Sequence, residues 1–269
     1  MSARRAIALL VVAGLLAGSG GAARASSHHP VSHASTSVSV WFKRSARLWH
    51  TKRTGATASF PVRTAVRALL DGPNAAESAA GVKTAVPGGT KLLSTAVTSG
   101  VATINLRQKF ASPAPRKNIR MRLAQLTFTA TQFANVHAVH LEIAGSAVAS
   151  IGGFPVPAQM TRSTFSRLVP AIVVHDPAIA AHLTSGIRVT GMSDVFEAVM
   201  VVKVLNSGGH LLARKVFMAS CGTGCRGHFA VTIVYHVGNA QAGSVVVTDT
   251  SARGGRPPNI VRIPVRLSP

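Results

Sequence analysis

Two spacings of apolar residues, one of period two and one of period 3.6, follow one another along the first half of the chain. Apolar residues alternate with polar ones over 38–42, which predicts a half-buried strand. Over 62–70 they recur at i, i+3, i+4, i+7 and i+8, which predicts a helix with one buried face. The Gly-Pro pair at 72–73 ends this helix, because glycine supplies a left-handed cap and proline forbids a further turn. Asn74, followed three residues later by Glu77, predicts a capping box for a second, short helix.

A hairpin and a second helix complete this part of the chain. The strand-like runs 91–98 and 101–106 are joined by Ser99-Gly100, which is hairpin spacing with a tight turn. Helical spacing returns once more and strand spacing twice; these elements cover 119–133, 136–144 and 147–151. Two amphipathic helices that cover one face of a small mixed sheet make an α+β domain. We therefore expect an α+β domain over residues 38–167.

The pattern changes at Pro170, after which helical spacing is absent and short strand-like runs remain. Turn signals such as Asp176-Pro177 and Arg253-Gly254-Gly255 separate these runs. Short strands at this density predict an all-β sandwich over residues 168–269. The predicted strands cover 171–174, 187–191, 195–205, 211–219, 227–236, 244–248 and 260–267.

Short motifs in both halves carry a family resemblance. In the first half they are Val40-Trp41-Phe42, Ala68-Leu69-Leu70-Asp71-Gly72-Pro73, Val86-Pro87-Gly88-Gly89-Thr90-Lys91-Leu92-Leu93, Gly100-Val101-Ala102-Thr103-Ile104-Asn105-Leu106, Leu123-Ala124-Gln125-Leu126, and Thr131-Gln132-Phe133 with Val136. In this order they resemble the GerMN domain of bacterial sporulation and germination proteins.

The second half has its own motifs. They include Thr184-Ser185-Gly186, Val189-Thr190-Gly191, Val195-Phe196-Glu197-Ala198, Arg226-Gly227-His228-Phe229 and Thr250-Ser251-Ala252-Arg253-Gly254. They resemble the immunoglobulin-like domain that often accompanies GerMN in spore-germination proteins. The pairing implies a non-catalytic module linked to sporulation or germination, and some GerMN domains look like ring-building modules of envelope complexes.

The N-terminus predicts export. Arg4 and Arg5 precede an apolar run over 6–17, and Ala23-Arg24-Ala25 provides a cleavage pattern. We expect a signal peptide over residues 1–25, cut after Ala25, and a flexible leader over 26–37. An uncut segment kept as an anchor remains the alternative. No other stretch reaches transmembrane length, so we expect a secreted, envelope-associated protein.

The charge balance narrows the function. The chain has 29 Lys and Arg against 7 Asp and Glu, a formal net charge of +22. Scattered carboxylates exclude EF-hands and acid-pair glycosidases, which need clustered acids. Export argues against nucleic acid, so we expect the partner to be an envelope protein or an anionic cell-wall polymer.

Two groups of basic residues are candidate sites for an anion or a partner. One group lies between Trp41 and Trp49, and the other lies near the start of the second long helix, where the helix dipole disfavours cations. An external anion would explain the second group, and a solvated face is the alternative. The candidates are Lys43, Arg44, Arg47, Arg116, Lys117, Arg120 and Arg122.

Cys221 and Cys225 are the only cysteines, and in an exported protein they are expected to form a disulfide. The open alternatives are a metal site with His210 and His228, and a Cys225 nucleophile. No catalytic residue, metal site or cofactor is predicted. The remaining histidines are expected at the surface or in turns; they are His50, His137, His140, His175, His182 and His236.

The sequence therefore predicts a non-catalytic, exported protein of the cell envelope. It would serve as a GerMN scaffold or binding module in protein assembly or cell-wall association. A binder of anionic cell-wall polymer and, less favoured, a wall-modifying enzyme that uses Cys225 are the alternatives.

Overall fold

A long antiparallel hairpin opens the described part of the chain, which covers residues 36–56, 61–250 and 257–269 of the computed structural model. Strand β1 (Thr36–Arg44) pairs with β2 (Arg47–Ala56), and the short β3 (Val82–Lys83) pairs with the other edge of β1. The strand predicted over 38–42 is confirmed. The sequence pattern misses β2, because the turn at Ser45-Ala46 has neither glycine nor proline. The predicted signal peptide, and the leader up to residue 35, lie outside the described residues.

Helices α1 (Pro61–Asp71) and α2 (Ala75–Ala79) follow the hairpin. The apolar stripe of α1 is buried as predicted, and Gly72 caps its end with a φ of 84°. The predicted capping box is confirmed. The Asn74 side chain accepts a hydrogen bond from the Glu77 N–H at 2.9 Å, and the Glu77 carboxylate accepts one from the Asn74 N–H at 2.9 Å.

A second sheet has the strand order β4-β5-β6-β7. Its first two strands form the predicted hairpin, in which Gly100 has a φ of 79° and a Cβ there would lie 2.6 Å from the His137 ring. β5 then pairs in parallel with β6, and the crossover contains the 3₁₀ helix η1 and the long helix α3. The elements are β4 (Leu92–Thr98), β5 (Val101–Leu106), η1 (Gln108–Ala111), α3 (Arg116–Ala130), β6 (Ala138–Ile143) and β7 (Ser146–Ala147).

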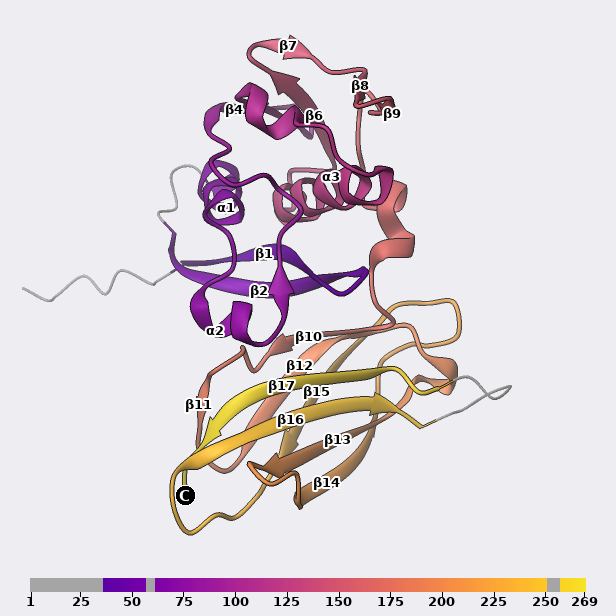
Figure 1. The fold of residues 1–269 in the computed structure, drawn as a ribbon. Coiled ribbons are helices and arrows are strands. Elements are labelled where there is room, and N and C mark those ends of the chain that lie inside the picture. Colours follow the sequence, from indigo (N-terminus) through magenta and orange to yellow (C-terminus); the bar gives the residue numbers. More distant parts are fainter. Residues whose placement is uncertain (1–35, 57–60, 251–256) are drawn as a thin grey trace, which may run out of the picture. The chain divides into compact units, whose positions relative to one another are not determined.

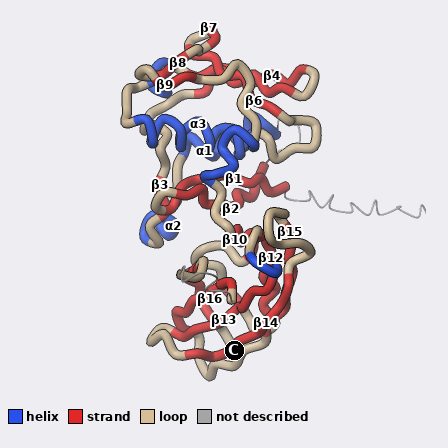
Figure 2. Tube along the Cα trace, turned by 90° about the vertical axis from the view of Figure 1, so that its right-hand side faces the viewer, coloured by secondary structure: helices blue, strands red, loops and turns tan. Residues whose placement is uncertain are grey.

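Helices α1 and α3 lie between the two sheets (Figure 1), whereas the pattern predicted helices on one face of one sheet. Both helices contact β1, while α1 also contacts β4 and α3 also contacts β6. Figure 2 shows the same order of layers. Every residue of α3 from Met121 to Ala130 is buried, because the helix packs between the two sheets and also contacts α1 and η2. The exposed first turn, with Arg116 and Lys117, is the exception.

A short connecting segment follows β7. The two-residue strands β8 (Ser150–Ile151) and β9 (Phe154–Pro155) pair with each other, so the strand predicted over 147–151 is divided between β7 and β8. The 3₁₀ helix η2 (Ser163–Leu168) comes next. The domain boundary expected between residues 167 and 168 falls at its last residues.

The C-terminal region is a two-sheet sandwich of the predicted kind, with strand orders β10-β12-β15 and β11-β17-β16-β13-β14. All seven predicted strand regions contain a strand, and the two-residue β11 is additional. The strand expected from Val195 begins only at Val199, because the 3₁₀ turn η3 (Phe196–Ala198) precedes it. The strands are β10 (Ile172–Asp176), β11 (His182–Leu183), β12 (Ile187–Ser193), β13 (Val199–Asn206), β14 (Leu211–Met218), β15 (Gly227–Ile233), β16 (Gln241–Asp249) and β17 (Ile260–Leu267).

Two hydrophobic cores stabilise these regions. The first gathers residues of both N-terminal sheets and of the helices between them, such as Phe42 and Leu123. The second fills the sandwich, where the buried Tyr235 hydroxyl donates to a carbonyl oxygen at 2.6 Å. Val173 of β10 packs into the first core although it belongs to the sandwich. The two regions therefore share a packed junction inside one compact unit, residues 35–269.

Candidate functional site

The tip of the β1–β2 hairpin divides the predicted basic residues between two cavities. Lys43 pairs with Leu48 and Arg44 pairs with Arg47 in the hairpin register. Successive residues of a strand point to opposite faces. Lys43 accordingly lines one cavity, while Arg44 and Arg47 line another, and Ser45 at the turn borders both. We call the first cavity the basic pocket and the second the junction pocket.

The basic pocket brings together four of the seven predicted cations: Lys43, Arg116, Lys117 and Arg120. It has a volume of about 720 Å³ and no Asp or Glu among its lining residues. The first turn of α3 forms one wall, and no side chain caps its backbone N–H groups, since Pro115 occupies the N-cap. Uncapped N–H groups and the positive end of the helix dipole both favour an anion here.

Arg116 is held in place at the edge of this pocket. Its guanidinium carbon lies 5.4 Å from the centre of the Phe154 ring, and one of its N–H groups donates to the Gly153 carbonyl at 3.3 Å. A cation over an aromatic face keeps most of its donors free. The β8–β9 turn thus orients a guanidinium that can still bind a carboxylate or phosphate.

Arg122 does not belong to this surface, in contrast to the sequence-based expectation. Its side chain is buried, and its guanidinium donates to the carbonyl oxygens of Ala85 (3.2 Å), Ser112 (3.0 Å) and Phe110. Burial lowers the pKa of Arg122 below its ordinary value. The guanidinium links the chain at Ala85 and at Phe110–Ser112 to α3 through hydrogen bonds. It is therefore not available to an external anion.

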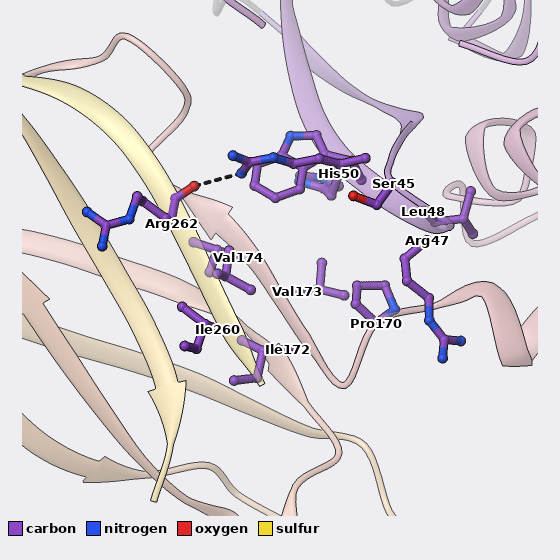
Figure 3. A pocket seen from close by; sticks show the side chains of 13 residues that line it. Ser45, Arg47, Leu48, His50, Pro170, Ile172, Val173, Val174, Ile260 and Arg262 are labelled. Carbon is purple, nitrogen blue, oxygen red and sulfur yellow. Dashed lines mark hydrogen bonds between the residues drawn. The ribbon is translucent and has the colours of Figure 1, made fainter. Parts of the chain in front are cut away.

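The junction pocket lies between the β1–β2 hairpin and strands β10 and β17, with a volume of about 280 Å³ (Figure 3). Arg44 stacks on Trp49, with its guanidinium carbon 4.9 Å from the ring centre, and donates to the Arg262 carbonyl at 2.8 Å. Burial lowers the pKa of Arg44. Arg47, the cross-strand partner of Arg44, donates to the Arg167 carbonyl. Arg44 and Arg47, both predicted from the sequence, therefore line the junction pocket, whose position the sequence did not predict.

Two histidines pack against each other beside this pocket. His50 is only 8% exposed, and its ring centre lies 4.5 Å from that of His175 on β10. Its Nε2 is 3.0 Å from the Ser39 hydroxyl. The neighbouring Lys52 forms an ion pair with Asp176 at 2.7 Å, which joins β2 to β10. The sequence missed this cluster, because it gave no strand over 47–56 and so placed His50 at the surface.

Burial and neighbouring charges set the ionisation of this cluster. Burial, with His175 and Lys52 nearby, lowers the pKa of His50 to about 3. Burial and Lys52 lower the pKa of His175 as well. For Asp176, burial raises the pKa, but hydrogen bonds from Lys52 and Thr190 outweigh it, so the pKa lies below its usual value. At neutral pH the junction therefore holds two neutral imidazoles and one ion pair.

Comparison with known families assigns both halves of the chain. Residues 34–149 match the family Germane, described as sporulation and spore germination. Residues 171–256 match the family Gmad2, described as an immunoglobulin-like domain of bacterial spore germination. The chain therefore contains a Germane domain over residues 34–149, followed by a Gmad2 domain over residues 171–256. Neither description names an enzyme, and both resemblances expected from the sequence motifs are confirmed.

Solved structures of sporulation proteins are similar to this chain. The first GerMN domain of GerM from Bacillus subtilis is 17% identical, with a TM-score of 0.40, over 48% of this chain and 98% of that one. The tandem GerMN domains of the same protein are 13% identical, with a TM-score of 0.41, over 74% of this chain and 61% of that one. No curated protein matches the chain significantly.

In the Gmad2 domain, Cys221 and Cys225 form the expected disulfide. The loop is tied to the segment before β13, since the Gly224 N–H donates to the Asp194 carboxylate at 2.9 Å and the Thr223 hydroxyl accepts from the Glu197 N–H at 3.1 Å. Within the described residues, no three His, Cys, Asp or Glu side chains form a group that could hold a metal ion. In the same residues, no helix is long and apolar enough to cross a membrane.

Proposed function

We propose that this protein is an exported, non-catalytic module of the cell envelope, which associates with an anionic cell-wall polymer through the basic pocket of its Germane domain. One observation carries the proposal: residues 43 and 116–120, far apart in the sequence, contribute four cations to one cavity without a carboxylate. Teichoic-type polymers present repeated phosphates, and guanidinium groups bind phosphates through parallel hydrogen bonds. Export rests on the signal-peptide pattern of residues 1–25.

The charge distribution supports an external partner. The described residues contain two ion pairs, Lys52–Asp176 and Arg53–Glu77, and neither involves the basic pocket. Its cations are therefore not neutralised within the described part of the chain. Unpaired like charges in one cavity repel one another, and a bound polyanion would relieve that repulsion.

The enzyme alternative has less support. A cysteine-dependent reaction needs a thiolate, and the Cys221–Cys225 disulfide leaves none at Cys225.

Sedimentation with purified cell walls tests the proposal. The double variant Lys117→Ala/Arg120→Ala removes two cations of the basic pocket, and Arg188→Ala/Arg266→Ala removes two exposed cations of the Gmad2 domain as a matched control. We expect the first variant to bind walls on the order of tenfold more weakly, which corresponds to about 1.4 kcal/mol. Wild-type binding should also weaken as salt rises, because salt screens exposed charges.

Two results would contradict the proposal. Equal losses for both double variants would mean that net charge, and not the pocket, drives binding. Wall binding that does not change with salt would exclude the electrostatic mechanism.

A further inference from the structure

The junction pocket is a concave apolar site that the proposed wall association does not use. Pro170, Ile172, Val174 and Ile260, all labelled in Figure 3, contribute its apolar walls together with Trp49. Its volume of about 280 Å³ lies just below the roughly 300–1,000 Å³ of small-molecule sites. The pocket therefore has room for one ring or one branched apolar group.

Positive charge borders the pocket at the hairpin. Arg44 and Arg47 are among its lining residues and no Asp or Glu is, whereas the Arg262 guanidinium donates to the Ser244 hydroxyl at 3.0 Å and points away from the pocket (Figure 3). A guanidinium has five N–H donors, so Arg44 keeps donors free beyond its bond to the Arg262 carbonyl. The group that enters the pocket is therefore best carried by an acidic partner. A second copy of this chain is disfavoured, because the formal net charge is +22.

A strand edge borders the pocket on one side. β17 pairs with β16 along its length, but on its other side β11 reaches only Arg266 and Leu267. The stretch from Ile260 to Arg262, which lines the pocket, has no strand paired at this edge within the described residues. The Arg262 carbonyl already accepts from Arg44, so the backbone groups of Ile260 are the ones left for a peptide. Exposed strand edges bind extended peptides through backbone hydrogen bonds, with side-chain pockets beside them for specificity.

We propose that the junction pocket binds one bulky apolar side chain of an extended, acidic peptide segment of another protein. The peptide backbone lies along the β17 edge near Ile260, the apolar side chain fills the pocket, and the peptide carboxylates face Arg44 and Arg47. Hot spots of protein interfaces commonly consist of a buried aromatic or aliphatic side chain surrounded by polar and charged residues. This protein contact goes beyond wall association and uses different residues.

Fluorescence anisotropy with a defined probe tests the proposal. The probe is a fluorescein-labelled peptide with three glutamates on either side of one phenylalanine, and the comparison peptide has serine in place of phenylalanine. We expect the phenylalanine peptide to bind roughly tenfold more tightly, as one well-buried anchor provides. Ile260→Asp should remove this preference, because Ile260 is 61% exposed and the substitution puts a carboxylate at the pocket mouth without disturbing the core.

Val234→Asp is the matched control, since Val234 is 59% exposed and does not line the pocket. It should keep the full preference for phenylalanine, and so should Lys117→Ala/Arg120→Ala in the basic pocket. Loss of the preference in the basic-pocket variant would overturn the separation of the two sites. Equal affinity for both peptides, or equal effects of Ile260→Asp and Val234→Asp, would overturn the peptide site itself.

Vesicles of phosphatidylglycerol are a third probe. If they bind more tightly than the peptide and Ile260→Asp abolishes that binding, the pocket binds a lipid and the proposal fails.

Discussion

Arg122 is the predicted site residue whose role the structure changes most. The sequence groups it with the cations that bind an external anion, whereas the structure buries its side chain in the Germane domain. The substitution Arg122→Met keeps much of the apolar stem and removes the guanidinium. Three carbonyl oxygens, those of Ala85, Phe110 and Ser112, would lose their donor. A buried acceptor left without a partner costs about 1–3 kcal/mol, less where water reaches it, so we expect a loss of about 3–5 kcal/mol in the free energy of unfolding. For a protein of this size, each kcal/mol lowers Tm by about 2–4 °C.

Thermal unfolding followed by circular dichroism measures this loss. Lys117→Met is the matched control, since Lys117 lies on the same helix with an exposed side chain. We expect Arg122→Met to lower Tm by roughly 6–20 °C and Lys117→Met to leave it nearly unchanged. In wall sedimentation the order should reverse, with Lys117→Met showing the weaker binding. If Arg122→Met unfolds at the wild-type temperature, the guanidinium does not support the fold and its assignment to the interior cross-link is wrong.

Two further predictions concern the histidine cluster and the disulfide. Because the pKa of His50 is about 3 in the folded protein and about 6.5 in the unfolded chain, the unfolded chain binds more protons between these values, and stability falls as pH decreases through this window. At pH 4.5 the free energy of unfolding should be about 2–3 kcal/mol lower than at pH 7. Denaturant midpoints at the two pH values measure this loss, which should be smaller in His50→Gln. A loss in His50→Gln equal to that of the wild type would refute the assignment to His50. Cys225→Ser opens a very small loop and should cost about 2 kcal/mol, measured by denaturant unfolding without reductant. The native protein should not react with a thiol-specific dye; a reactive Cys225 would reopen the enzyme hypothesis.

Local sequence signals predicted much of the fold. Gly72 and Gly100 fix a cap and a turn through their left-handed backbone conformation, and Asn74 caps α2 with its side chain, so the elements beside them could be placed from the sequence. The strand β2 escaped prediction, because its turn at Ser45-Ala46 uses residues without a turn signature. Missing β2 also hid the sheet β2-β1-β3, and with it the reason why α3 is buried on nearly every side.

The candidate site was only partly accessible from the sequence, because it depends on which faces the chain brings together. Lys43 was identifiable in the basic stretch between two tryptophans, and the cations of 116–120 as an excess of charge near a helix start. Their convergence requires the hairpin tip to lie against the first turn of α3. Arg122, two residues after Arg120, is buried instead, because its side of the helix faces Ala85 and Phe110.

Sequence alone determined most of the order of elements, although not β2, together with the two domain families, the disulfide pair and the basic character, since each depends on local spacing or composition. Tertiary structure decided which charges are buried and which are exposed, that a histidine pair and an ion pair join β2 to β10, and that an apolar pocket forms beside an open strand edge. Those properties arise from contacts between different elements, such as Arg122 with Ala85 and Lys52 with Asp176, and such contacts leave no mark in the local pattern of either segment.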